Sequence, residues 1–157
     1  MICPMDRLDA QILSVLQEDG RITNAELAER VRLSPSPCLR RLRKLERDGV
    51  IDGYRATLNR RRVGLGVTVF VEVKTSGHSA DIAARVEQAL NEIPEVIAAH
   101  IVSGPADFLL EVVVADLDHY ERLLIEQLLN LPGVTDVRSN FALRTIKAGA
   151  PLPVRAR

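Results

Sequence analysis

The segment from Ser34 to Gly49 constrains this chain more than any other, because it has a helix signal at each end and two unlike faces between them. Ser34 is placed to cap a helix N-terminus, and Pro35 suits the first helical position, where no N–H donor is needed. Gly49 supplies the left-handed residue with which helices commonly end. The segment therefore predicts a single helix.

The two faces of this expected helix differ in charge. At about 100° per residue, one side collects the apolar residues Cys38, Leu39, Leu42 and Leu45. The other side is polar and mostly cationic, and it consists of Ser36, Pro37, Arg40, Arg43, Lys44 and Arg47, with Arg41 on its flank. A solvated surface helix is the simpler alternative. The one-sided charge instead favours a helix that packs on a small core and lies against phosphates.

Charge is also uneven along the whole chain, although the net charge of its 157 residues is zero. Residues 1–63 carry 13 Lys and Arg against 9 Asp and Glu, whereas residues 64–157 carry 8 against 12. A basic first part and an acidic second part indicate two modules, of which the first faces a polyanion. No apolar run approaches the roughly 20 residues of a membrane span, and no signal-peptide pattern is present. Cys3 and Cys38 have no disulfide or metal spacing. We therefore expect a cytoplasmic protein without a membrane partner.

Two further helices are expected before the basic one. Residues 6–18 place apolar side chains on one helical face, and Thr23-Asn24-Ala25-Glu26 matches the capping box that opens a helix. Only a few residues separate this second helix from the third, which predicts a helix-turn-helix whose second helix enters the major groove of DNA. The first turns of this basic helix, with Ser36, Pro37 and Arg40, would lie nearest the base edges. Phosphate contacts are expected from the remaining cations, which are Arg41, Arg43, Lys44 and Arg47.

Residues 50–58 alternate around an Asp-Gly turn signal, which predicts a short hairpin or a pair of extended segments. Three consecutive arginines, 60–62, and two glycines follow. We interpret this run as a solvated linker, and an additional phosphate contact is the alternative. The expected organisation is a helix-turn-helix DNA-binding domain at 1–53, a hairpin and linker at 54–66, and a second domain at 67–157.

The second part alternates between strand and helix patterns. Strands are expected near 67–74, 96–102, 107–114 and 134–146, and helices near 79–91 and 117–129. Its two halves echo each other: Ile93-Pro94-Glu95-Val96, for example, resembles Leu131-Pro132-Gly133-Val134. A duplicated strand–helix–strand predicts a ferredoxin-like βαββαβ domain and an α+β chain. Because such a domain has helices on one sheet face only, we expect the other face to be aliphatic and covered by a second copy, giving a homodimer.

No catalytic set emerges from the sequence. His78, His100 and His119 lie apart, and none has a zinc-ligand spacing. We therefore expect no enzyme activity, no cofactor and no metal. The loop from Ser103 to Asp107 reads either as a turn or as a place where Asp107 pairs with a cationic group such as an α-amine, and composition favours the turn.

Two other classes of protein remain as alternatives. One is a metabolic enzyme or small-molecule-binding protein built on the ferredoxin-like domain without DNA binding. The other is RNA binding by the sheet, which needs exposed aromatic side chains for stacking and ranks last because the chain has only five Phe and Tyr residues.

Taken together, these residues resemble the Lrp/AsnC (leucine-responsive, feast/famine) family of transcription regulators over nearly the whole chain. The motifs that carry the resemblance are Leu8-Asp9 to Ile12-Leu13, Gly20-Arg21, Asn24 to Leu27, Leu33-Ser34-Pro35-Ser36-Pro37-Cys38, Arg41 to Leu45-Glu46, Gly49-Val50-Ile51, Gly53-Tyr54, Val102-Ser103-Gly104 with Asp107, and Leu131-Pro132-Gly133-Val134. The Ser-Pro-x-Pro-Cys opening of the basic helix is the most specific of them.

The resemblance implies an N-terminal winged helix-turn-helix that binds double-stranded DNA. Ser34 to Arg47 would hold the recognition helix, with Ser34 and Asn24 among the DNA contacts. The resemblance also implies an effector domain that dimerises through its sheet, with dimers commonly assembling into octamers. Small effectors, usually amino acids, would bind between effector domains near Ser103, Gly104 and Asp107, with Asn140, Phe141 and Ala142 close by. Asp107 thereby becomes the expected partner of the amine. The expected function is a sequence-specific transcription regulator that responds to a small effector, an amino acid.

Overall fold

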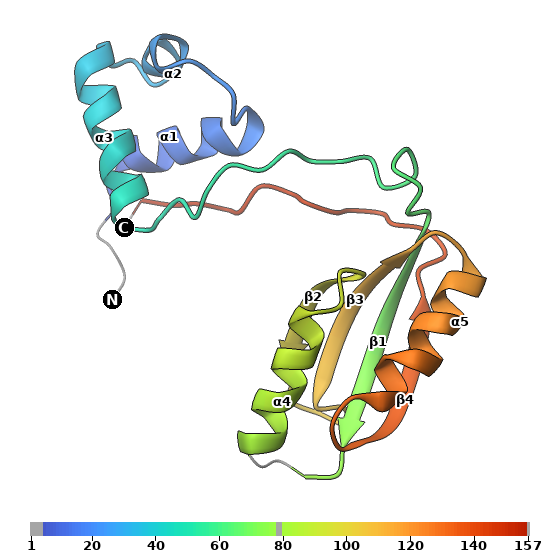
Figure 1. Ribbon diagram of the computed structural model, residues 1–157. Coiled ribbons are helices and arrows are strands. Elements are labelled where there is room, and N and C mark those ends of the chain that lie inside the picture. The colour runs from blue at the N-terminus through green and yellow to red at the C-terminus, as the bar shows by residue number, and fades with distance from the viewer. Residues whose placement is uncertain (1–4, 78–79, 157) are drawn as a thin grey trace. The chain divides into compact units, whose positions relative to one another are not determined.

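The computed structural model describes residues 5–77 and 80–156, and these divide into two compact units (Figure 1). One unit contains the residues up to Thr57 together with Lys147 onward, and the other runs from Leu58 to Ile146. The sequence placed the tail from Lys147 in the second domain, whereas the structure packs it with the first. Among the described residues, no helix combines the length and the apolar character that crossing a membrane requires.

Three helices build the first unit, as predicted: α1 (Arg7–Glu18), α2 (Asn24–Arg30) and α3 (Pro35–Arg47). Capping boxes open the first two. Asp6 Oδ1 accepts from Asp9 N–H at 2.9 Å, and Thr23 Oγ1 accepts from Glu26 N–H at 3.3 Å. Ser34 occupies the N-cap position of α3, but its side chain makes no capping hydrogen bond, contrary to expectation. The prediction that the Ser34 hydroxyl caps this helix is therefore wrong.

The end of α3 is a Schellman motif built on Gly49. This residue has φ 68°, its N–H donates to Glu46 O at 3.1 Å, and the N–H of Val50 donates to Leu45 O at 2.9 Å. Residues 50–58 contain no paired strand, so of the two predicted forms only the extended one occurs. Cys38 and Leu45 on the apolar face of α3 are buried, which confirms the predicted stripe. The small core they join also contains Ile12, Leu13, Leu27, Ala28 and Val31.

The second unit is an antiparallel sheet with two helices, and it confirms the predicted ferredoxin-like βαββαβ order. In chain order its elements are β1 (Val67–Thr75), α4 (Ala80–Asn91), β2 (Val96–Ile101), β3 (Phe108–Val114), α5 (Leu117–Glu126), a short 3₁₀ helix (Leu128–Asn130) and β4 (Val134–Phe141). The strands lie in the order β2-β3-β1-β4. Ser79 and His78, just before α4, lie outside the described residues.

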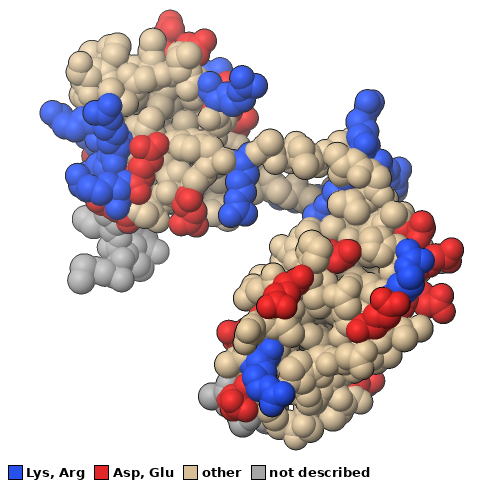
Figure 2. Space-filling view, viewed as in Figure 1, with Lys and Arg blue, Asp and Glu red and all other residues tan. Residues whose placement is uncertain are grey.

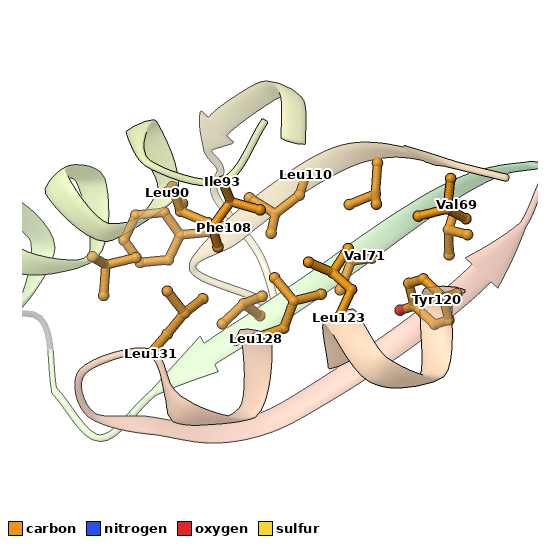
Figure 3. Close-up of a cluster of buried hydrophobic side chains, with 14 residues drawn as sticks. Val69, Val71, Leu90, Ile93, Phe108, Leu110, Tyr120, Leu123, Leu128 and Leu131 are labelled. Atoms are coloured by element: carbon orange, nitrogen blue, oxygen red, sulfur yellow. The ribbon is translucent and has the colours of Figure 1, made fainter. Parts of the chain in front are cut away.

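The core of this unit lies between the sheet and its helices (Figure 3). Val69, Val71 and Val73 of β1 are fully buried there, packed with Val86 of α4 and Leu123 of α5 among others. The aliphatic side of β1 is therefore the side covered by the helices. The opposite side of β1 carries Thr68, Phe70, Glu72 and Lys74, and Leu109 and Val113 of β3 lie on the same face of the sheet. The open face is therefore mixed, and the prediction that it is aliphatic is wrong.

The internal repeat is visible in matching turns. Val96 N–H donates to Ile93 O at 3.1 Å before β2, and Val134 N–H donates to Leu131 O at 3.2 Å before β4. The fourth strand ends at Phe141 rather than at the predicted 146. Its partner β1 begins at Val67, and Ala142 N–H makes the last bond, to Thr68 O. Residues 143–146 are not paired in the sheet.

Candidate functional site

The solvent side of α3 concentrates positive charge, as the sequence predicts. Figure 2 shows Lys and Arg atoms gathered where Figure 1 places this helix. Arg40, Arg43 and Lys44 are exposed and form no ion pair with any described residue, whereas Arg47 pairs with the neighbouring Asp48 at 3.0 Å. Ser34 and Ser36 are also exposed, and Pro37 is half-buried. The helix thus presents cations and small polar groups along one side.

Arg41 is the exception on this helix, because its guanidinium faces the protein. Its Nη1 atom lies 2.6 Å from Asp6 Oδ2 and 2.8 Å from Asp9 Oδ1, the two acids of the α1 capping box. These carboxylates, Asp6 foremost, raise the pKa of Arg41. The pKa of Asp6 lies below its usual value, mainly because the backbone N–H of Asp9 donates to it, with Arg41 adding to the effect. Arg41 therefore fastens the middle of α3 to the start of α1.

Asn24 also has an internal role. Its Nδ2 donates to Pro35 O at 3.0 Å, which ties the first residue of α2 to the first residue of α3. Its Oδ1 is buried and has no hydrogen-bond partner among the described residues. The turn between these helices contains Arg32 in the left-handed region at φ 57°. The placement of α2 relative to α3 thus depends on the Asn24–Pro35 hydrogen bond and on the left-handed backbone at Arg32.

In the second unit, a cavity of about 290 Å³ lies beside the predicted Ser103–Asp107 loop. Its lining combines apolar and polar groups: Thr75, Gly77, Ala83, Ile101, Val102, Ser103, Gly104, Asp107 and Phe108. Gly104 has φ 135°, a conformation that side-chain-bearing residues rarely adopt, so the loop backbone needs a glycine there. Three of the predicted effector residues therefore share one cavity.

Asp107 is held firmly at the edge of this cavity. Its Oδ2 accepts from Thr75 N–H at 2.7 Å and lies 2.9 Å from Thr75 Oγ1, and its own N–H donates to Val73 O at 3.0 Å. The carboxylate thus ties the start of β3 to the end of β1. This agrees with the interpretation of the loop as a turn, and the role of amine partner stays a prediction.

The other three predicted effector residues lie elsewhere in the sheet. Phe141 pairs with Val69 near the start of β1, whereas Phe108 pairs with Val73 near its end. Four residues of strand separate the two places by about 13 Å. Asn140 Nδ2 donates to Glu72 Oε1 at 3.3 Å, and Phe141 packs edge-on against Tyr120. One copy of the chain therefore does not bring Asn140, Phe141 and Ala142 to the cavity.

Thr75, Ile101 and Phe108 line the cavity but were not singled out from the sequence. Their common position depends on the register of β1 against β3, which sequence patterns did not provide. Cys38 is buried, which raises the pKa of its thiol, and Cys3 lies outside the described residues. Among the described residues, no three His, Cys, Asp or Glu side chains gather as they would around a metal ion.

Comparison with known proteins also divides the chain into two parts. Residues 5–52 match the family model for a winged helix-turn-helix DNA-binding domain, and residues 68–152 match the model for the Lrp/AsnC ligand-binding domain. The leucine-responsive regulatory protein of Escherichia coli K12 is 42% identical over 98% of this chain and 93% of its own length. That of Klebsiella pneumoniae gives the same figures.

Solved structures agree with the sequence comparison. A transcriptional regulator from Neisseria meningitidis, in complex with L-methionine, is 40% identical with a TM-score of 0.90 and covers 95% of this chain and 96% of its own. An AsnC family regulator from Agrobacterium tumefaciens is 42% identical, also with a TM-score of 0.90, over 95% and 97%.

A helix-turn-helix with an exposed cationic second helix, followed by a ligand-binding ferredoxin-like domain, defines a DNA-binding transcription regulator that responds to a small effector. The match over almost the entire length makes the assignment more specific. The chain belongs to the Lrp/AsnC family.

Proposed function

We propose that α3 lies in the major groove of DNA and that an amino acid, bound by the second unit, sets DNA affinity or assembly state. The observation that carries the first part is the exposed side of α3, on which Arg40, Arg43 and Lys44 have no acidic partner among the described residues. On the second helix of a helix-turn-helix, unpaired cations are suited to contacting DNA phosphates. Ser36 and Pro37, in the first turn of this helix, are placed to contact base edges.

The full set proposed for DNA contact is Asn24, Ser34, Ser36, Pro37, Arg40, Arg43, Lys44 and Arg47. Ser34 belongs to this set because its hydroxyl is exposed and is not used as a cap. Arg41 leaves it, because its guanidinium is engaged by Asp6 and Asp9. We assign Arg41 to holding α3 in place.

Exchanging Arg40 and Lys44 together for alanine tests the DNA interface. Each lost phosphate contact should reduce the slope of log affinity against log salt by about 0.9, so the double variant should lose roughly 2 units of slope and bind more weakly. Fluorescence anisotropy with a labelled duplex at several salt concentrations measures both. Arg85→Ala with Arg122→Ala removes the same charge from exposed positions on α4 and α5 and should leave the slope unchanged. Equal slopes for parent and Arg40/Lys44 variant would contradict the assignment.

The second part of the proposal rests on the cavity next to Asp107. A carboxylate, the polar Ser103–Gly104 backbone and the apolar Ile101 and Phe108 match the amine, carboxylate and side chain of an amino acid. The Neisseria relative was solved with L-methionine, and so was a feast/famine regulator from Mycobacterium tuberculosis that is 34% identical. We propose that the chain binds its amino acid without transforming it.

We further propose that the complete site forms between copies of the chain. Ser103, Gly104 and Asp107 would come from one copy, and Asn140, Phe141 and Ala142 from another, because they lie too far apart along β1 to meet within one sheet. A homodimer, assembling to an octamer, would supply such interfaces. Effector binding would then favour one assembly over another, which requires different affinities for the two.

A thermal-shift panel against the standard amino acids tests the effector proposal. A ligand at about 100 times its Kd adds roughly 2.7 kcal/mol and should raise the melting temperature by several degrees. Asp107→Asn keeps an oxygen for Thr75 but removes the charge, so it should fold, bind DNA and lose the response. Thr75→Val removes the hydroxyl contact to Asp107 but keeps the Asp107 charge, so it controls for the loss of that contact in the turn. A response that survives in Asp107→Asn would place the amine partner elsewhere.

A further inference from the structure

The C-terminal tail is bound to the helical unit by a reciprocal pair of hydrogen bonds. Leu152 N–H donates to Gln17 Oε1 at 2.6 Å, and Gln17 Nε2 donates to Leu152 O at 3.2 Å. The amide of one side chain thus pairs with both polar backbone groups of a residue 135 positions away. Two residues later, Val154 packs against the hydrophobic core of the same unit.

The sequence around Leu152 prepares it for this contact. Pro151 and Pro153 flank it, and a residue before proline is restricted to extended conformations. An extended residue directs its N–H and C=O to the same side, where one carboxamide can satisfy both. The prolines have no N–H, so Leu152 supplies the donor in this tripeptide, and their rigidity lowers the entropy lost on docking.

The receiving surface is a groove of about 910 Å³ along the end of α1 and the extended segment after α3. Leu13 and Leu16 of α1 and Val50 and Ile51 of the segment line it, together with Leu152 and Val154 of the tail. Tyr54 holds the segment to α3 by donating to Glu46 Oε1 at 3.0 Å. Burial, with the Glu46 carboxylate adding to it, raises the pKa of Tyr54 to about 12, so the donor proton is retained.

The tail follows the proposed effector segment in the chain. β4 ends at Phe141, inside the proposed effector segment Asn140–Ala142, and the chain then leads through residues 143–150 to Leu152. The helical unit is therefore attached to the sheet unit twice: once through the linker after Thr57 and once through the docked tail. The second attachment starts at the effector segment itself.

We infer that the docked tail is a releasable strap that transmits the state of the effector segment to the DNA-binding unit. This inference depends on the proposed function for its coupling role, but the docking does not. The contact is weak enough to have two states: each neutral hydrogen bond shifts an equilibrium only roughly fivefold, and Leu152 as a whole is 73% exposed. An effector that displaces residues 140–142 can thus favour the docked or the released tail.

Hydrogen exchange on the full-length protein tests the docking without DNA or effector. In the parent chain the amides of Leu152 and Val154 should be protected, since each donates a hydrogen bond. In Gln17→Ala the Leu152 amide should exchange about tenfold faster or more. Gln11→Ala, the same substitution at an exposed glutamine of α1 that does not line the groove, should leave it unchanged. An unprotected Leu152 amide in the parent would overturn the docking and leave the proposed function intact.

The coupling is measured by DNA affinity with and without L-methionine, or another amino acid that shifts the melting temperature. Gln17→Ala should still bind the amino acid, but the ratio of the two DNA affinities should fall toward one. Val154→Asp, which disrupts the apolar part of the contact, should do the same, and Gln11→Ala should keep the parental ratio. If both Gln17→Ala and Val154→Asp keep the parental ratio of DNA affinities, the strap is overturned. A parent that binds no DNA overturns the proposed function, and the exchange result still decides the docking.

Discussion

Arg41 differs from the other cations of α3 because the acids it contacts belong to the same unit. Asp9 is nearly buried, with 7% of its side chain exposed, and its carboxylate faces Arg41 at 2.8 Å. A buried carboxylate without a cation is costly, so the pair contributes more than surface ion pairs usually do. In sequence, Arg41 is indistinguishable from its neighbour Arg40, and only the packing of α1 on α3 separates their roles.

Replacing Arg41 with glutamine should lower the free energy of unfolding by about 1–2 kcal/mol, a value reduced for the 30% exposure of the Arg41 side chain. The salt slope of DNA binding should stay parental, because no phosphate contact is lost. Urea denaturation and anisotropy titrations measure the two effects. Arg43→Gln should behave in the opposite way, with little change in stability and a slope lower by about 0.9. A reduced slope in Arg41→Gln would return Arg41 to the DNA interface.

At the scale of elements, local sequence signals predicted the helices well. The Thr23–Glu26 capping box, Pro35 and Gly49 mark helix ends through contacts among residues a few positions apart, so they appear in the structure where the sequence indicates them. Strand ends depend on a partner. β4 ends at Phe141, where its ladder with β1 stops opposite Val69, although the sequence predicted a strand to residue 146.

The two N-caps of the helix-turn-helix provide a matched test of this account. Thr23→Ala should lower the free energy of unfolding by about 1 kcal/mol, because the hydroxyl accepts from Glu26 N–H. Ser34→Ala should change it by less than about 0.5 kcal/mol, because the Ser34 side chain makes no capping bond. Thermal or urea unfolding of both variants gives the comparison. Equal losses would mean that Ser34 caps α3 in solution.

At the scale of the whole molecule, the separation of the two effector segments leads to a prediction about assembly. Asp107→Asn and Asn140→Ala should each abolish the amino-acid response when present in every copy. If the site forms between copies, mixing the two variants should restore roughly a quarter of the sites, those that receive an intact segment from each of two chains. Calorimetric titration of the co-assembled mixture measures this fraction. No recovery would show that a single chain provides both segments.

Sequence alone determined the features that arise from neighbouring residues: the helix-turn-helix, the cationic side of α3, the repeated strand–helix–strand order and the glycine-containing loop at Ser103–Asp107. These depend on capping, periodicity and backbone preference, which act over a few positions. Only the tertiary structure decided that Arg41 binds Asp6 and Asp9, that Asp107 is tied to Thr75, which side of the sheet is aliphatic, and that the tail returns to Gln17. Each joins residues at least 32 positions apart or depends on which face the helices cover, and no local pattern encodes such contacts.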